Sequence, residues 1–356
     1  MQPATNKVPF IRGRGSNINP ENRFETVAIE PDPEAFAQDE EPILRTEYYV
    51  DNTREILAKN DSLDLPFNYS INPYRGCEHG CIYCYARPTH EYFGFSSGLD
   101  FETKILVKQK AADLLAEKFQ SRGWAPQLIA FSGNTDCYQP VEKQLQLTRK
   151  CLAVFLDFRN PTGIITKNAL ILRDLDILEE LARLQLVSVA ISVTTLSNAL
   201  AGKMEPRASS PMKRLDTLEK LAAAGIPTSV MIAPVIPGLT DHEIPAILRE
   251  CAGRGVKHAA YILLRLPHSV KELVQNWLRT HYPDRENKVL NSVKETRAGN
   301  LNDPRFGSRM SGTGVRAEMI KKMFELSCKK YGMNEDTIEL TTKLFRRGSR
   351  KQLQLF

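Results

Sequence analysis

The sequence contains no hydrophobic run that could cross a membrane, because a spanning helix needs about 18 consecutive apolar residues and none of the 356 residues opens such a stretch. The first residues, MQPATNKVPFIRGRG, also lack the apolar segment of about 7–15 residues that marks a secretory signal. We therefore expect a cytoplasmic protein that has no membrane partner.

A disulfide framework is absent as well. The seven cysteines are an odd number, and three of them fall within eight residues. Such crowding suits metal or redox chemistry in a reducing compartment better than disulfide pairing. Cys151, Cys251 and Cys328 lie in helical patterns, where free cysteine is commonly a small core residue. No second cysteine cluster is present.

The charge is unevenly distributed. Residues 271–356 contain 18 Lys+Arg and 10 Asp+Glu, a balance of +8, whereas the other 270 residues have a balance of −2. Arg297, Arg305, Arg309 and Arg316 surround a Gly-rich loop, and RRGSRK occupies 346–351. Such a region is either a solvated surface or a contact for a polyanion such as nucleic acid.

The chain divides into three regions that differ in composition and in the pattern of apolar residues. Residues 1–65 are rich in Pro, Asn and acidic residues, for example in PDPEAFAQDEEP, and predict an irregular N-terminal extension. Residues 66–268 alternate short apolar runs with amphipathic segments and predict the catalytic core. Residues 269–356 contain the helical patterns VKELVQNWLRTHY and VRAEMIKKMFELSCKKYG and predict a basic helical C-terminal cap.

The core predicts six parallel strands in an α/β fold. The apolar runs occupy 66–72, 127–133, 163–168, 187–195, 227–235 and 256–264. Helical stripes lie between them, such as the one formed by Leu175, Leu178, Leu181 and Leu184. Strands that alternate with helices indicate βαβ units, with ligands bound at the carboxyl ends of the strands. Periodicity leaves open whether the sheet is a partial barrel or doubly wound.

The motif RGCEHGCIYCYAR follows the first predicted strand and places Cys77, Cys81 and Cys84 in the spacing C-x3-C-x2-C. Cysteine thiolates are the usual ligands of iron–sulfur clusters. Three cysteines leave one iron of a four-iron cluster open, as a reactive metal centre requires. The alternative is a structural zinc site completed by His79, although zinc sites favour a second short hook that this sequence lacks.

The cysteine spacing resembles the signature of the radical S-adenosylmethionine (SAM) superfamily. Within it, NPYRGCEHGCIYCYAR, SGNTDCYQPVE and MEPRASSPMKRL resemble the spore photoproduct lyase-like group of DNA repair photolyase homologues. The resemblance spans about residues 66–268 and implies a (β/α)6 partial TIM barrel. It also implies a [4Fe–4S] cluster whose open iron chelates the methionine part of SAM, so that reduction yields a 5′-deoxyadenosyl radical.

The same resemblance implies further site residues. SAM would be held by residues at the ends of the second, third and fourth strands and in MEPR, namely Ser132, Gly133, Asn134, Thr135, Asp136, Lys167, Ser192 and Arg207. Pro237-Gly238 resembles a stretch that packs against adenine.

Hydrogen transfer would involve Tyr83 and Tyr85, which flank the third cysteine. Lyases of this group also have a cysteine near the second strand, but the corresponding position here falls near Gly133, and Cys137 lies four residues further on. That departure makes photoproduct reversal itself an open question.

Three functions follow as hypotheses. The first is a radical SAM enzyme, of lyase or oxidoreductase type, that acts on a nucleic acid. The second is the same machinery acting on a protein or small molecule. The third is a non-catalytic nucleic-acid-binding module stabilised by metal. Either enzyme needs a reducing partner of flavodoxin or ferredoxin type, whose acidic surface would complement the basic tail.

Overall fold

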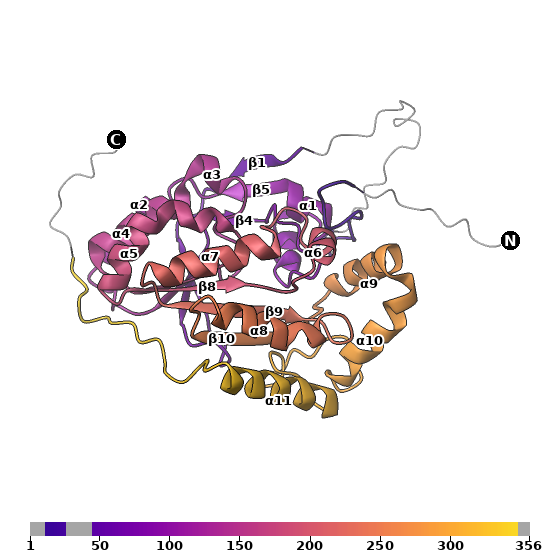
Figure 1. Cartoon of the computed structure of the whole chain (residues 1–356). Helices are drawn as coiled ribbons and strands as arrows, with labels where there is room; N and C mark the ends of the chain where they lie inside the picture. The colour runs from indigo at the N-terminus through magenta and orange to yellow at the C-terminus, as the bar shows by residue number, and fades with distance from the viewer. Residues whose placement is uncertain (1–10, 26–44, 348–356) are drawn as a thin grey trace.

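The computed structural model describes residues 11–25 and 45–347. Its centre is a seven-stranded sheet with the order β10-β9-β8-β7-β6-β3-β2 (Figure 1). Six strands are parallel and follow one another in sequence order: β3 (Tyr69–Ile71), β6 (Ile129–Phe131), β7 (Thr162–Thr166), β8 (Val187–Ser192), β9 (Thr228–Val235) and β10 (His258–Leu263). Five fall within the predicted apolar runs and β7 begins one residue before its run, so the prediction of six parallel strands is confirmed.

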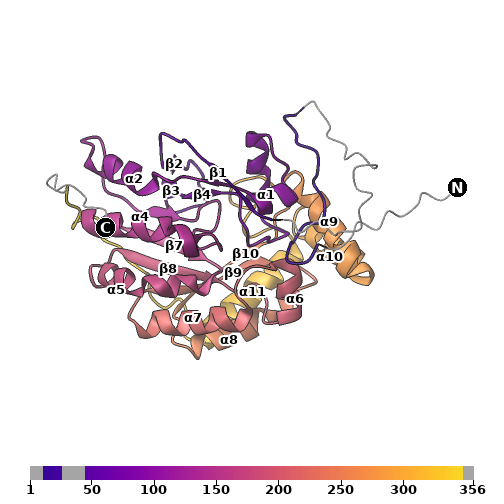
Figure 2. The same ribbon diagram turned by 90° about the horizontal axis from the view of Figure 1, so that it is seen from above.

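Strand β8 is buried on both faces for most of its length, which explains why its sequence is mostly apolar. In β8 the side chains of Val187, Val189 and Ile191 have no exposed surface, and Ala190 on the other face is 9% exposed. In β7, β9 and β10 the residues of one face are only partly buried. Helices cover the outer face and connect the strands: α2 (Ala111–Gln120), α3 (Glu142–Leu145), α4 (Leu147–Phe158), α5 (Leu175–Arg183), α6 (Asn198–Met204), α7 (Pro211–Ala223) and α8 (Ile244–Ala252). Figure 2 shows these helices along one side of the sheet.

The predicted irregular extension is more ordered than its composition indicates. It contains β1 (Glu47–Val50), which pairs in parallel with β5 (Lys104–Val107), and β2 (Leu57–Lys59), which pairs antiparallel with β3. A second sheet has the order β1-β5-β4, where β4 spans Tyr74–Arg75. Strands of four and three residues give too few alternations to be recognised, and the partner of β1 is distant in sequence.

Residues 11–25, here called the N-terminal strap, lie against α1 (Leu99–Thr103) and the 3-10 helix η1 (Arg87–Phe93). The side chain of Asn22 donates to the Glu91 carbonyl at 2.9 Å, and Leu99 N donates to Ile18 O at 3.1 Å. The PDPEAFAQDEEP segment lies outside the described residues.

The C-terminal region contains α9 (Val270–His281), α10 (Glu286–Glu295) and α11 (Val315–Lys330), of which α11 packs against α8. The sequence patterns predicted α9 and α11 but missed α10, whose buried side chains Val289, Leu290 and Val293 make only one short stripe. Within the described ranges, every helix is too short or too polar to span a lipid bilayer.

Residues 331–347, here called the C-terminal strap, run beneath the amino ends of the strands (Figure 1). Asn334 N donates to Lys257 O at 2.8 Å, Thr341 N to Gln185 O at 2.9 Å, and Arg346 N to Phe158 O at 2.9 Å. Each acceptor lies shortly before a parallel strand. This strap therefore closes the end of the sheet opposite the carboxyl ends of the strands.

Candidate active site

The cysteine loop begins directly after β4 and turns around two glycines with left-handed backbone, Gly76 (φ +76°) and Gly80 (φ +68°). The amide of Cys77 donates to Phe101 O at 2.8 Å, and that of Ile82 donates to Met204 O at 3.0 Å. The loop is thus fixed at both ends. Its three cysteines are unpaired thiols that line one cavity.

A buried carboxylate holds the loop from behind. Glu102 has no exposed surface and accepts hydrogen bonds from the amides of Gly15 and Ser16, both at 2.9 Å. It also accepts from the guanidinium of Arg87, which is itself fully buried. A Cβ added at Gly15 would lie 1.7 Å from the Gly80 carbonyl oxygen. The N-terminal strap therefore contacts the cysteine loop backbone to backbone, and only glycine fits there.

The cavity lies at the carboxyl ends of the parallel strands, as expected for an α/β sheet. Eleven of the fourteen predicted site residues line it: Cys77, Cys81, Tyr83, Cys84, Tyr85, Ser132, Asn134, Thr135, Asp136, Lys167 and Ser192. The structure thus gathers side chains from the cysteine loop and from the ends of β6, β7 and β8. Its other wall, from β9 and β10, is largely apolar.

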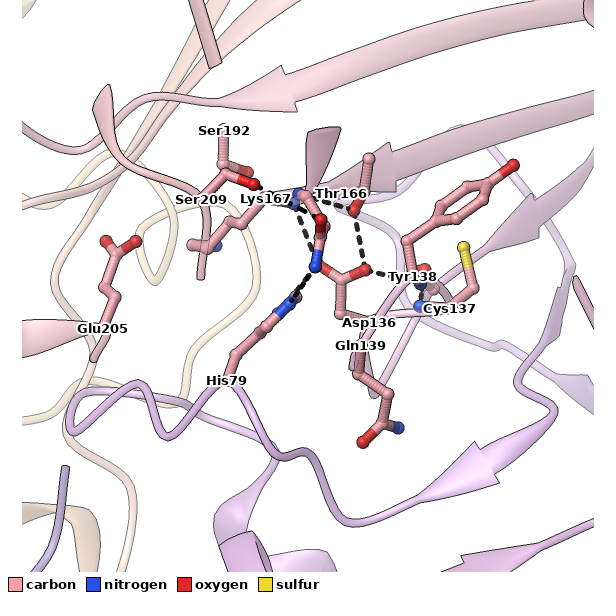
Figure 3. A network of polar contacts seen from close by, with 12 residues as sticks. His79, Asp136, Cys137, Tyr138, Gln139, Thr166, Lys167, Ser192, Glu205 and Ser209 are labelled. Carbon is pink, nitrogen blue, oxygen red and sulfur yellow. Dashed lines mark hydrogen bonds and ion pairs between the residues drawn. The ribbon is translucent and has the colours of Figure 1, made fainter. Parts of the chain in front are cut away.

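Asp136 is the centre of a polar network at the cysteine end of the cavity (Figure 3). Its Oδ1 accepts from Thr166 Oγ1 at 2.7 Å, and its Oδ2 accepts from the Lys167 amide at 2.9 Å. His79 Nδ1 lies 3.4 Å from Oδ2. Burial alone raises the pKa of Asp136, but His79, Thr166 and the Lys167 amide outweigh it and lower the pKa to about 2. Asp136 is therefore a carboxylate at neutral pH.

A second buried network lies beneath Tyr83. Glu205 accepts hydrogen bonds from Tyr83, Thr194 and Arg214, and both Glu205 and Arg214 are almost fully buried. Burial raises the pKa of Glu205, yet Arg214 and Lys167 outweigh burial and lower the pKa to about 2. The phenol of Tyr83 is thereby fixed against the floor of the cavity, whereas Tyr85 is 49% exposed and donates to the Gly133 carbonyl at 2.8 Å.

Three predicted residues do not line the cavity. Gly133 lies behind Tyr85 as its hydrogen-bond acceptor. Cys137 is fully buried in the main hydrophobic core, and its sulfur points away from His79 and Lys167 (Figure 3). Arg207 lies behind the cysteine loop, where it forms an ion pair with Glu78 at 3.1 Å.

The proposed adenine stretch is also displaced from the cavity. Gly238 faces α10, because a Cβ added there would lie 3.0 Å from Ser292 Oγ. Pro234, three residues before Pro237, is the proline of this segment that lines the cavity.

The arginines of the Gly-rich loop are mostly engaged within the chain. Arg297 is buried and donates to the carbonyls of Leu263, Leu264, Ser308 and Arg309. Arg305, Arg309 and Arg316 form ion pairs with Asp303, Asp64 and Glu295. Arg346 and Arg347 lie on the C-terminal strap, at the end of the sheet opposite the cavity. Residues 348–351 lie outside the described ranges.

The sequence reasoning missed the charged side chains that complete the site. Glu102, Glu205, Arg214 and Arg265 were not singled out, although Glu205 and Arg214 lie in the segment MEPRASSPMKRL. Buried ions are identified by their partners, and those partners are distant in sequence. Arg265 follows β10 by two residues, so its position after a predicted strand was the available signal.

The surroundings of the Cys77 and Cys81 thiols favour their protonated form as long as no metal cation is near. Burial raises the pKa of the Cys77 thiol well above its ordinary value and that of Cys81 to about 12, and nearby carboxylates add to both effects. Metal binding must therefore displace their protons. Among the described residues, no three His, Cys, Asp or Glu side chains are grouped closely enough to hold a single metal ion.

Comparison with known proteins finds a matching family model and several similar sequences. The family model of the radical SAM superfamily matches residues 71–251. An uncharacterized protein of Mycobacterium tuberculosis is 36% identical over 238 residues, which cover 65% of this chain and 70% of that protein. A radical SAM Nalpha-GlyT isomerase of Pseudomonas phage M6 is 22% identical over 230 residues, 64% of this chain and 46% of the isomerase.

Among solved structures, spore photoproduct lyase complexed with dinucleoside spore photoproduct superposes with a TM-score of 0.57 and 17% identity, covering 80% of each chain. At this identity the match concerns the fold.

Proposed function

The chain belongs to the radical SAM superfamily, and from this premise we propose that Cys77, Cys81 and Cys84 bind a [4Fe–4S] cluster whose open iron binds SAM. The observation that carries the proposal is that three free thiols line the same cavity as Asp136 and Lys167. When bound, the cluster supplies the electron that cleaves SAM to methionine and a 5′-deoxyadenosyl radical.

The donor set fits this group better than it fits zinc. A four-iron cluster takes its three thiolates on three different irons, so the sulfurs need not converge on one point. His79, the zinc ligand of the alternative, is already placed between two partners. Its Nε2 lies 3.0 Å from the Asn168 amide nitrogen, and its Nδ1 faces Asp136. Because no three His, Cys, Asp or Glu side chains among the described residues are grouped to hold one metal ion, His79 does not complete a zinc site with the cysteines.

We assign the methionine part of SAM to the polar end of the cavity. Asp136 is anionic and Lys167 is cationic, so together they complement the ammonium and carboxylate groups of an amino acid. The ammonium would approach Oδ2 of Asp136, which accepts from the Lys167 amide and lies 3.4 Å from His79 Nδ1 among the described residues. Ser192, Asn134 and Thr135 supply further polar contacts around it. Arg207 contributes from behind the loop by fixing Glu78.

For hydrogen transfer we favour Tyr85 over Tyr83 and Cys137. Tyr85 is half-exposed beside Cys84, whereas the phenol of Tyr83 is bound to Glu205 and Cys137 is enclosed in the core. Tyr83 would then position the cluster loop.

We further propose that the six parallel strands form the (β/α)6 partial barrel of the superfamily. The chain would divide into an N-terminal extension (1–65), a radical SAM core (66–268) and a C-terminal cap (269–356). Support comes from the strand order and from the shared fold with spore photoproduct lyase.

A nucleic acid or one of its components is our proposed substrate. The solved structure with the shared fold holds a dinucleoside photoproduct, and the phage relative is named as a Nalpha-GlyT isomerase. A protein or small-molecule substrate is the second candidate, favoured by the engagement of the C-terminal arginines in internal ion pairs. Both need a reductant of flavodoxin or ferredoxin type.

The test is anaerobic reconstitution with iron and sulfide, followed by reduction in the presence of SAM. We expect about four irons per chain, a reduced-cluster EPR signal altered by SAM, and 5′-deoxyadenosine as a product. Replacing Cys77, Cys81 or Cys84 by Ala should abolish all three results. Cys251→Ala is the matched control, because Cys251 is equally buried but lies in α8.

Two results would reject the proposal. One is stoichiometric zinc that survives iron reconstitution. The other is a bound cluster without any 5′-deoxyadenosine, which would favour the non-catalytic module.

A further inference from the structure

Arg265 lines the cavity, and part of its guanidinium is without a hydrogen-bond partner among the described residues. Its Nε is buried and has no hydrogen-bond partner among the described residues. The one polar contact of its Nη1 in that part of the chain is with the sulfur of Met310, a weak acceptor, at 3.7 Å. Buried donors of a guanidinium are normally bonded. Among the described residues Arg265 forms no ion pair with a carboxylate, so the part of its side chain that lines the cavity can meet an anion that enters there.

The neighbouring carboxylate does not fill this role. Asp64 accepts from the Gly307 amide at 2.6 Å and forms an ion pair with Arg309 at 2.5 Å. Arg309 is thereby paired with Asp64 and lies over the ring of Phe306. Burial and the proximity of Arg309 lower the pKa of Arg265. A cation in these surroundings gains from an anion that enters the cavity.

The residues that line the cavity near Arg265 indicate the chemistry of the rest of that ligand. The guanidinium carbon lies 5.7 Å from the ring centroid of Tyr85. Met231, Pro234 and Ile262 continue the apolar wall. The polar groups that complement an amino acid lie at the other end, around Asp136 and Lys167. The part of the cavity around Arg265 thus combines the flat ring of Tyr85, an apolar wall and the planar, positively charged guanidinium.

We propose that Arg265 binds an oxyanion of the substrate, and that this oxyanion is the phosphodiester of a dinucleotide unit. This inference rests on the proposed function. The guanidinium fork matches two phosphate oxygens, and the phenol ring beside it offers a stacking surface for a base. Arg265 is a binding residue for the substrate and has no part in holding SAM.

The test compares two dinucleoside probes that differ only in their linkage, which is charged in one and uncharged in the other. Thymidylyl-thymidine and its methylphosphonate analogue, in which the charged oxygen is replaced by a methyl group, are titrated into the reconstituted full chain in the presence of SAM. We expect the wild type to bind the phosphodiester at least roughly tenfold more tightly, as a charge-assisted contact implies. Arg265→Gln should remove this preference. Arg265→Lys should retain part of it, because the charge remains and the fork is lost.

Arg316→Gln is the matched control, since Arg316 is also an arginine of the basic region but pairs with Glu295 outside the cavity. It should leave the preference unchanged. The idea is overturned if the wild type binds both probes equally or neither, or if Arg265→Gln keeps the preference. It is also overturned if Arg265→Gln weakens SAM binding as much as probe binding, because Arg265 would then serve SAM.

Formation of 5′-deoxyadenosine by the same preparation keeps the two proposals apart. A wild type that cleaves SAM but shows no linkage preference rejects the role of Arg265 alone. A wild type that never cleaves SAM rejects the proposed function.

Discussion

The two ends of the parallel sheet are closed by straps that both make hydrogen bonds through their backbones but differ in their other contacts. At the carboxyl end, the N-terminal strap is fixed by amide bonds to the buried Glu102 and by the contact between Gly15 and Gly80. At the amino end, the C-terminal strap packs Phe345 near Phe119 and Phe158, with ring centroids 6.2 and 6.5 Å apart. Directional bonds fix positions to fractions of an ångström, whereas apolar contacts tolerate small shifts. At the end that holds the cysteines, the strap adds bonds to a buried carboxylate and a close glycine contact, whereas at the other end it adds apolar packing.

Removing a buried charge at the carboxyl end should have the largest effect. Glu205→Gln leaves Arg214 buried without its counter-ion, and breaking such a pair costs about 3–5 kcal/mol in the free energy of unfolding. Urea denaturation of wild type and variant at pH 7 measures it. Glu286→Gln is the control, because its partner Arg279 is largely exposed, and this change should cost less than about 1 kcal/mol.

The pH dependence gives a second readout of the same variant. The pKa of Glu205 is lowered from 4.5 to about 2 in the folded protein. Its stabilisation is therefore fully present above the unfolded value and is lost as the pH falls through the folded one. The difference between wild type and Glu205→Gln should stay constant from pH 8 to about pH 5 and shrink only in stronger acid. A difference that disappears already near pH 6 would contradict this assignment.

A steric change in the N-terminal strap should have an intermediate effect. In Gly15→Ala the new Cβ would overlap the Gly80 carbonyl, so the strap or the cysteine loop must move. We expect unfolding to become easier by roughly 1–3 kcal/mol and the iron content after reconstitution to fall. Gly202→Ala in α6 has no atom within 4 Å of its new Cβ and should keep its iron. Full iron content in Gly15→Ala would show that the loop does not depend on the strap.

The smallest effect is expected at the amino end. Phe345→Ala removes a partly buried ring from the aromatic cluster, so the loss should be roughly 1–2 kcal/mol, below that of a fully buried phenylalanine. Iron content and SAM cleavage should match the wild type when measured well below the unfolding temperature. Loss of iron in this variant would mean that the two ends are coupled, and the contrast between the straps would fail.

The sequence predicted the parts of the molecule whose pattern is local. The six parallel strands are recognisable because each has at least one buried face and forms a short, largely apolar run, as in β8. Strand β1 was missed because its four side chains are all exposed and its partner β5 lies more than fifty residues away. No hydrophobic period marks such a strand.

The same distinction applies to the site. The cysteines, Asp136, Lys167 and Ser192 were predicted because they lie in or near recognisable motifs at strand ends. Arg265 and the pair of Glu205 with Arg214 resemble surface charges in the sequence, and only tertiary packing buries them. Arg207 was assigned to SAM because its motif is near the site, yet its side chain faces Glu78 behind the loop.

The ion pair of Asp64 with Arg309 joins segments 245 residues apart in the chain. Chain growth at about 5–20 residues per second separates the synthesis of Cys84 from that of Arg309 by roughly 10–45 seconds. During that time the cysteine loop has left the ribosome while one side of its pocket does not yet exist. The nascent thiols are thus open to oxidants and to stray metal ions before the pocket closes. If the cysteines bind the proposed cluster, we expect iron and sulfide to be delivered best after synthesis of the C-terminal region, so that the order of translation becomes part of maturation.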